Sequence, residues 1–118
     1  MTLDPAALAD MLQAVGDDPE FVGDVVDTYL ADAEAQLSGM EAALAAGDVE
    51  TLGRHAHTLK GNSRTVGATA LAEIAAGLEA QARAGEFAGA DVQIQAAATE
   101  FERVAAALEA ARARGWTA

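Results

Sequence analysis

Apolar residues recur at intervals of three and four between positions 22 and 44, and this spacing limits the possible folds more than any other feature. The residues that follow it are Val22, Val26, Tyr29, Ala33, Leu37, Met40 and Leu44. Such spacing places the apolar side chains on one face of a helix. Alternating apolar and polar runs, which would indicate strands, are missing, whereas alanine, leucine and glutamate dominate. The sequence therefore predicts an all-α protein.

Short signals mark where the helices begin and end. Asp4 and Asp18 each precede a proline, an arrangement that favours the first turn of a helix. Gly47 is expected to end one long helix and Asp48 to cap the next, which ends before Gly67. The expected helices cover residues 5–15, 19–46, 49–66, 70–84 and 90–113.

The four longer helices each have one apolar face and are joined by short connections. We therefore expect residues 1–118 to form one domain, an antiparallel up-down four-helix bundle with a short additional N-terminal helix across one end. Beyond the first long helix, the expected buried residues are Val49, Leu52, Ala56, Leu59, Ser63, Val66, Leu71, Ile74, Leu78, Ala82, Ile94, Ala98, Phe101, Ala105 and Leu108.

The charge of the chain argues against several classes of function. The net charge is −12, and residues 1–50 contain twelve acids and no lysine or arginine, whereas residues 51–118 contain seven acids and seven bases. Nucleic acid binding requires a clustered positive face, which this balance opposes. There is no cysteine, no basic leader and no apolar run near the roughly 20 residues that span a bilayer. We expect a cytoplasmic protein that binds neither nucleic acid nor membrane.

The helix expected over residues 49–66 carries an unusual second stripe opposite its apolar face. Its members are Gly53, Arg54, His57, Lys60, Gly61 and Arg64. A glycine inside a helix costs about 1 kcal/mol relative to alanine. Two glycines beside a histidine are therefore a local conflict of the kind expected at a functional site.

The chemistry of this stripe suits a phosphoryl carrier. Neutral imidazole is nucleophilic near neutral pH, and Lys60 could neutralise part of the charge of a group transferred to His57. Gly61, one turn after His57, leaves room for a bulky reactant. His55 lies about 200° around the helix from His57, so the two cannot chelate one metal ion. No phosphate-binding loop or metal cluster stands out, so we expect no cofactor or metal, and a partner must complete the reaction.

The segment "AHTLKGNSRTVGA", residues 56–68, resembles the signature of histidine-containing phosphotransfer (HPt) domains, in which an alanine–histidine pair precedes leucine, lysine, glycine and a later glycine–alanine. The flanking segments "ALAAGDVETLGRHAHTLKG" and "LAEIAAGLEAQARAGE" also resemble the family, so the similarity covers roughly residues 18–108. The fold of the family is a four-helix bundle, in agreement with the periodicity.

The resemblance implies that His57 accepts a phosphoryl group from the aspartyl phosphate of a response-regulator receiver domain and passes it reversibly to another receiver. Lys60 would give electrostatic support and Gly61 access for the receiver. Glu79 occupies the position of a polar residue that, in the family, hydrogen-bonds the second ring nitrogen, so it could hold Nδ1–H and leave Nε2 to react. Magnesium-dependent chemistry would belong to the receiver, and a hybrid histidine kinase would be a further partner.

The resemblance also implies a monomer without kinase activity of its own. Arg54, Gly61 and Arg64 are the expected contacts of the partner. Arg64 departs from the small residue that is common at its position in the family, so it would add a contact to the receiver or restrict which receiver can dock.

Other interpretations of the same residues stay open at this point. The chain could be an adaptor that docks a receiver or kinase without carrying phosphate, in which case His57 would be dispensable. It could also be a purely structural bundle. Lys60 and Arg64 could form ion pairs with Glu73 or Glu79 rather than serve a reaction. An autonomous enzyme is disfavoured because no paired carboxylates, nucleophile–base pair or metal site stands out.

Overall fold

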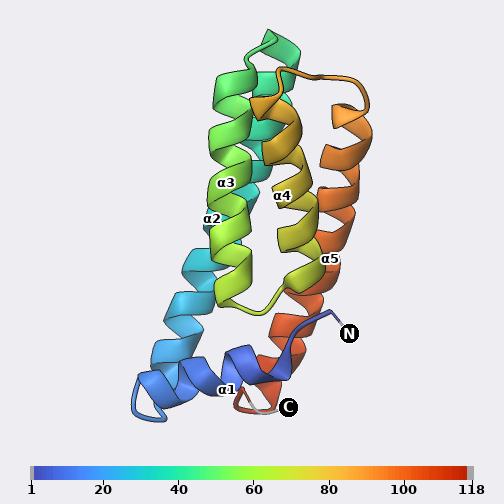
Figure 1. The fold of residues 1–118 in the computed structure, drawn as a ribbon. Coiled ribbons are helices and arrows are strands. Elements are labelled where there is room, and N and C mark those ends of the chain that lie inside the picture. Colours follow the sequence, from blue (N-terminus) through green and yellow to red (C-terminus); the bar gives the residue numbers. More distant parts are fainter. Residues whose placement is uncertain (1, 117–118) are drawn as a thin grey trace.

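The computed structural model describes residues 2–116, which form five α-helices and no strand (Figure 1). The all-α prediction is therefore confirmed for this part of the chain. The helices are α1 (Pro5–Ala14), α2 (Pro19–Ala46), α3 (Val49–Thr65), α4 (Thr69–Arg83) and α5 (Ala90–Ala113). No helix within residues 2–116 is long and apolar enough to cross a membrane.

Aspartate side chains cap the first three helices. A side-chain oxygen of Asp4 accepts a hydrogen bond from the backbone nitrogen of Ala6 at 3.0 Å, and Asp18 accepts one from Glu20 at 3.1 Å. Asp48 accepts from the backbone of Thr51 at 3.1 Å. Each bond satisfies a donor that the first turn of a helix leaves free, so these sequence signals set the starts of α1, α2 and α3.

The helix ends differ from the expected ranges by one residue at four places. Val15, Val66 and Ala84 are C-caps, so they lie just outside α1, α3 and α4 rather than inside them. At Val66 the backbone has φ −91° and ψ 4°, which leads the chain out of the helix into Gly67. Helix α4 begins at Thr69, one residue earlier than expected. Such terminal residues are the hardest to place from sequence, because a last turn changes gradually into a cap.

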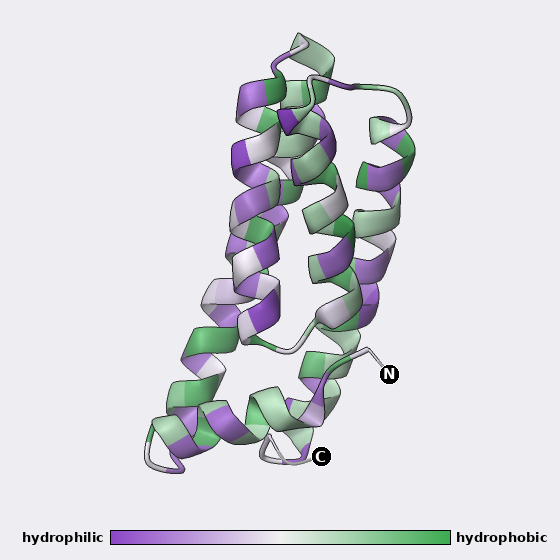
Figure 2. Ribbon diagram, in the orientation of Figure 1, coloured by the Kyte–Doolittle hydropathy of each residue, from purple (hydrophilic) through white to green (hydrophobic). Residues whose placement is uncertain are grey.

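The four long helices run antiparallel to their neighbours, and α1 lies across one end (Figure 1). Helix α3 packs between α2 and α4, and α5 closes the bundle by packing against both α2 and α4. Each long helix carries apolar and polar residues along its whole length, as Figure 2 shows. Burying one face of each helix therefore leaves an outer, mainly polar face on α3 free for a reactant.

Helix α5 buries a slightly different face from the expected one. Ala98 and Ala105 are only half-buried, whereas their neighbours Ala97 and Val104 are fully buried. Ile74 on α4 is likewise only half-buried. Helix α5 packs against both α2 and α4, and the face that it buries includes Ala97 and Val104.

The end of the bundle is closed by a contact between α1 and the turn after α3. The backbone nitrogen of Asp4 donates to the carbonyl of Gly67 at 2.8 Å. Gly67 has φ +77°, and a Cβ there would lie 2.7 Å from the Cβ of Ala7. Only glycine fits this position, because it tolerates the left-handed backbone and leaves room for α1. The short first helix therefore rests on the turn that joins α3 to α4.

Polar contacts fix α3 against α2. The hydroxyls of Tyr29 and Ser63 are 3.0 Å apart in the core, and the amide of Asn62 donates to Asp32 at 2.6 Å. Burial raises the pKa of Tyr29, with the hydrogen bond to Ser63 acting in the opposite direction, so the phenol keeps its proton at neutral pH. Since buried hydroxyls need partners, this pair favours one rotation of α3 about its axis.

His55 extends these contacts along the same side of α3. Its Nδ1 lies 2.7 Å from the side-chain oxygen of Gln36, whose amide donates to Asp32 at 3.2 Å. A Cβ at Gly39 would lie 2.5 Å from Nε2 of His55, so the imidazole rests directly on a bare stretch of α2. These contacts make His55 a packing residue between α2 and α3.

Replacing Gly39 with alanine should therefore stabilise the protein less than the same change at a glycine with free space. Gly77 on α4 has no atom within 4 Å of an added Cβ and is the matched control. G77A is expected to raise the free energy of unfolding by up to about 1 kcal/mol through helix propensity. G39A should be less stable than G77A by about 1–3 kcal/mol, because the ring of His55 must leave Gln36. Chemical denaturation of both variants measures this difference, and equal stabilities would contradict the packing of His55 on Gly39.

Candidate functional site

His57 projects from the outer face of α3 with 62% of its side chain exposed. Its Nδ1 lies 2.7 Å from a carboxylate oxygen of Glu79 on α4. An ionised carboxylate only accepts hydrogen bonds, so Nδ1 must carry the ring proton of the neutral imidazole. The other nitrogen, Nε2, then holds a free electron pair, and the ring presents it away from Glu79.

Glu79 is the acceptor on which this part of the molecule converges. Its side chain is only 5% exposed, yet it meets three donors. Oε2 accepts from Nδ1 of His57 and from a guanidinium nitrogen of Arg83, both at 2.7 Å, and Oε1 accepts from Nζ of Lys60 at 2.5 Å. The hydrogen bond from Lys60 is the largest influence that lowers the pKa of Glu79; His57 and the charge of Arg83 act in the same direction, against burial. Glu79 is therefore ionised at neutral pH.

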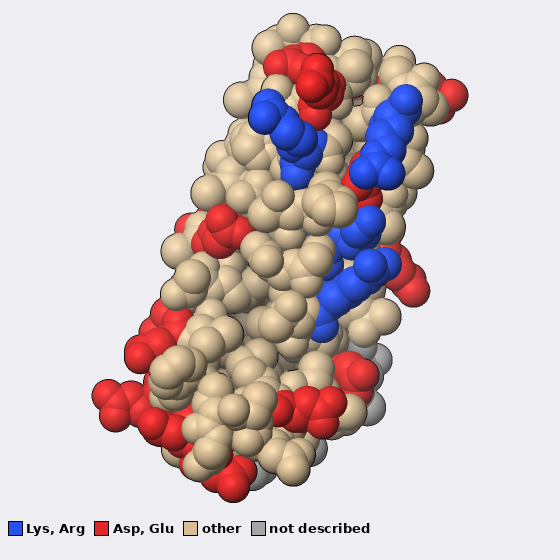
Figure 3. All heavy atoms as spheres, turned by 60° about the vertical axis from the view of Figure 1, so that its left-hand side comes forward, with Lys and Arg blue, Asp and Glu red and all other residues tan. Residues whose placement is uncertain are grey.

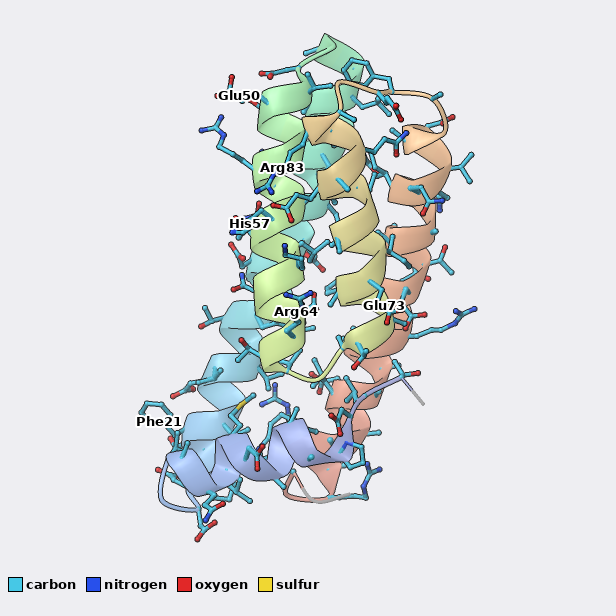
Figure 4. The ribbon with its side chains drawn as sticks, viewed as in Figure 1. Phe21, Glu50, His57, Arg64, Glu73 and Arg83 are labelled. Carbon is cyan, nitrogen blue, oxygen red and sulfur yellow. The ribbon has the colours of Figure 1, made fainter. Side chains whose placement is uncertain are left out.

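Lys60 and Arg83 reach Glu79 in different ways. The side chain of Lys60 is 20% exposed, so its ammonium is partly enclosed between α3 and α4. The side chain of Arg83 is 72% exposed and comes from the last turn of α4, four residues after Glu79. Figure 4 shows Arg83 and His57 on the same side of the bundle, next to each other. Arg83 was not among the residues predicted from the sequence, although a glutamate followed by an arginine at i+4 was a signal for it.

An open groove lies between α3 and α4 beside the imidazole. Its volume is about 550 Å³, and its walls include His57, Glu79, Arg54 and Arg83. A Cβ at Gly53 would lie 3.4 Å from that of Ala82, so the glycine lets the two helices approach closely at the floor of the groove. An added Cβ at Gly61 would meet nothing within 4 Å. The surface after His57 is therefore open to a large partner.

The remaining predicted partner contacts do not all lie in this groove. Arg54 lines it and also donates to Oγ1 of Thr51 at 3.2 Å. Arg64 is two helical turns after His57, about 10 Å along the axis, and lines a separate hollow that also includes Glu73 (Figure 4). Of the alternative ion pairs, Lys60 with Glu79 is formed. Among residues 2–116, no ion pair joins Arg64 to Glu73 or Glu79.

Charges are unevenly distributed over the surface. Lysine and arginine side chains gather over α3 and α4 in Figure 3, whereas acidic ones lie mainly at the end of the bundle near α1, with a smaller group at the opposite end. The exposed acids on α1, on the turn after it and on the start of α2 are Asp10, Asp17, Asp18, Glu20 and Asp24. Among residues 2–116, no group of three or more histidines and acids could hold a metal ion. Arg54 and Arg83 line the groove beside His57, and Lys60 shares the carboxylate of Glu79 with its imidazole, so the site suits an anionic group.

The fold and this site define a class of protein. The chain belongs to the Hpt-domain family, since the Hpt domain matches residues 24–114, which include His57, Lys60 and Glu79. Its structure is similar to the crystal structure of histidine-containing phosphotransfer protein B (HptB) from Pseudomonas aeruginosa PAO1. The two share 34% sequence identity over 96% of each chain, with a TM-score of 0.88. A search of curated proteins finds no matching sequence.

Membership of this family gives the chain a histidine phosphotransfer role in phosphorelays. Hpt domains are phosphocarrier modules rather than enzymes in themselves, and the family implies response-regulator receivers and histidine kinases as partners. The recognised family and the exposed imidazole therefore agree on the chemistry of a phosphoryl carrier.

The lowered pKa of Glu79 predicts how the stability of the folded protein depends on pH. Because the carboxylate has a lower pKa in the folded protein than its usual 4.5, its charge contributes stability above that value, which is lost as the pH falls through the folded pKa. E79Q should therefore have a lower unfolding temperature than the wild type at pH 7. The difference should shrink in thermal scans as the pH falls below 4.5, and a difference that does not change with pH would contradict the ionised, triply bonded Glu79.

Proposed function

We propose that His57 is the residue of this domain that carries the phosphoryl group, accepting it from the aspartyl phosphate of one receiver domain and delivering it to another. The observation that carries the proposal is the hydrogen bond from Nδ1 of His57 to Glu79, which leaves Nε2 as an exposed nucleophile. An exposed histidine without such a partner would have both tautomers available. Here the buried carboxylate favours the tautomer with its proton on Nδ1, whose free electron pair is on Nε2.

The step at His57 is a transfer between two nucleophiles. The electron pair of Nε2 forms the new nitrogen–phosphorus bond, the phosphorus–oxygen bond of the receiver's aspartyl phosphate breaks, and its electron pair stays on the aspartate as a carboxylate. The imidazole gains a positive charge, which Glu79 stabilises while Nδ1 keeps its proton. In the reverse step the same pair of electrons returns to Nε2, so one site serves acceptance and delivery.

Lys60 supports the transferred group from the side. Its ammonium, held 2.5 Å from Glu79, lies close to the imidazole and can neutralise part of the negative charge that arrives on phosphorus. Any magnesium ion in the reaction belongs to the receiver. The adaptor interpretation needs none of this arrangement, because docking alone does not require a free Nε2 beside a cation.

The direct test is to mix the protein with a panel of phosphorylated receiver domains and follow the label. Wild-type protein should take up a phosphoryl group that is labile in acid and stable in base, and mass spectrometry should place it on His57. H57Q should take up none, because the amide is not a nucleophile of this kind. E79A should transfer at least about tenfold more slowly, since one hydrogen bond to a charged group is worth roughly 1.5–3 kcal/mol. Receivers that bind without transferring label would favour the adaptor instead.

Gly61 allows a test of access that separates stability from transfer. G61A and G77A both add a methyl group in free space on an exposed helix, so both should be more stable than the wild type by up to about 1 kcal/mol. Only G61A should slow transfer, because its methyl group lies on the open surface one turn after His57. Equal transfer rates for the two variants would show that the receiver does not approach over Gly61.

A further inference from the structure

Arg83 is a cation of the site that the sequence did not reveal. Its guanidinium shares Oε2 of Glu79 with the imidazole of His57, and it forms one wall of the groove beside that ring. Figure 4 shows its side chain directed toward the same side as His57. Arg83 is therefore within reach of any group attached to His57.

The charges around Glu79 do not cancel. One carboxylate pairs with two permanent cations, Lys60 and Arg83. The groove beside them adds one acid, Glu50, and one base, Arg54, whose charges cancel, so an excess of one positive charge remains before His57 reacts. A second buried glutamate in the bundle has no such excess. Glu100 on α5 is 11% exposed and pairs with a single arginine, Arg103, at 3.1 Å. The excess at Glu79 is a property of the site and not of every buried glutamate in this protein.

Arg83 can change partner without leaving Glu79 unpaired. It is the most exposed of the three donors to Glu79, and Lys60 and His57 still hold the carboxylate when the arginine turns away. The guanidinium offers five donors in a planar fork that matches phosphate oxygens, and only one of its nitrogens is used on Glu79. Lys60 is the more enclosed of the two cations and holds the other oxygen of the carboxylate. Arg83 can therefore turn to a new anion while Lys60 keeps Glu79 ionised.

We propose that Arg83 is a second cationic ligand of the phosphoryl group, bound to Glu79 while His57 is free and donating to the phosphoryl oxygens once His57 is phosphorylated. This inference rests on the proposed function of His57. The phosphoryl group brings about two negative charges, which the excess positive charge at Glu79 is suited to meet. Arg83 then prolongs the phosphorylated state. A guanidinium bound to the phosphoryl oxygens withdraws negative charge that would otherwise help to break the bond between phosphorus and Nε2 of His57.

The experiment compares phosphorylated wild type with R83Q, R83K and the matched control R103Q. R103Q removes an arginine of similar exposure from a buried glutamate on the helix α5, away from His57. The chain of 118 residues is phosphorylated with phosphoramidate, a small phosphoryl donor that needs no receiver. Phosphorus NMR then follows the titration of the phosphoryl group, and loss of the signal gives its lifetime.

In R83Q the titration midpoint should rise by about one pH unit, the lower end of the shift that a neighbouring opposite charge produces. The lifetime should fall roughly fivefold, which corresponds to about 1 kcal/mol. R83K should recover part of both effects, and R103Q should match the wild type. A purely structural role of Arg83 would leave the titration midpoint unchanged.

The outcomes separate this inference from the proposed function. If wild type accepts label from receivers at His57 but R83Q has the same midpoint and lifetime as wild type, the role of Arg83 is wrong and that of His57 stands. If neither receivers nor phosphoramidate phosphorylate His57, both proposals are overturned. If R103Q changes as much as R83Q, the effect is one of general charge, and the specific contact is refuted.

Discussion

A carboxylate that is buried between two helices must be matched by donors, and the region around Glu79 is organised by this requirement. An unpaired buried charge would cost several kcal/mol. The donors come from both sides: His57 and Lys60 from α3, and Arg83 from α4. The same bonds that make the burial of Glu79 tolerable also set the orientation of the imidazole. The stability of the contact between α3 and α4 and the availability of the electron pair on Nε2 therefore both depend on the carboxylate of Glu79.

The opposite side of α3 is fixed independently. Tyr29 with Ser63, and Asp32 with Asn62, hold α3 against α2. His55 and His57 both use Nδ1 to contact a neighbouring helix, but their second nitrogens differ. That of His55 lies against Gly39, whereas the ring of His57 stands mostly exposed. Helix α3 is thus held on two sides, and two histidines two residues apart become a packing residue and a reactive one.

Local signals made most of the fold predictable. Aspartate caps, prolines in the first turn and glycines after the last turn act on the residues next to them. The helix bounds could therefore be predicted from the sequence to within one residue. The buried face of α5 was harder, because Ala97 and Ala98 are the same residue type and only the positions of α2 and α4 decide between them. Where alanine occurs on several faces of a helix, the spacing of apolar residues does not identify the buried face.

The candidate site was predictable on α3 and less so on α4. His57, Lys60 and Gly61 lie close together in sequence, so one helix is enough to recognise them. The position of Glu79 followed from the resemblance to the family, whereas its contact with Arg83 depends on how α4 packs, and no local rule distinguishes this glutamate–arginine pair from an exposed one. The role of Gly53 in bringing α3 and α4 close together likewise depends on Ala82 of the next helix, which the sequence around Gly53 does not indicate.

The separation of charge along the bundle has a consequence for how partners arrive. The molecule is elongated, with extents of 44, 21 and 18 Å. On the face in Figure 3, the cations lie between a larger acidic group at the α1 end and a smaller acidic group at the opposite end. Because the acidic group at the α1 end is the larger, the field of this anion is uneven along the bundle and exerts a torque on a charged partner before the two surfaces touch. Orientation of this kind raises the association rate more than the affinity. With a screening length of about 8 Å at physiological salt, added salt should slow encounters with a partner of opposite polarity, while the lifetime of the complex changes little.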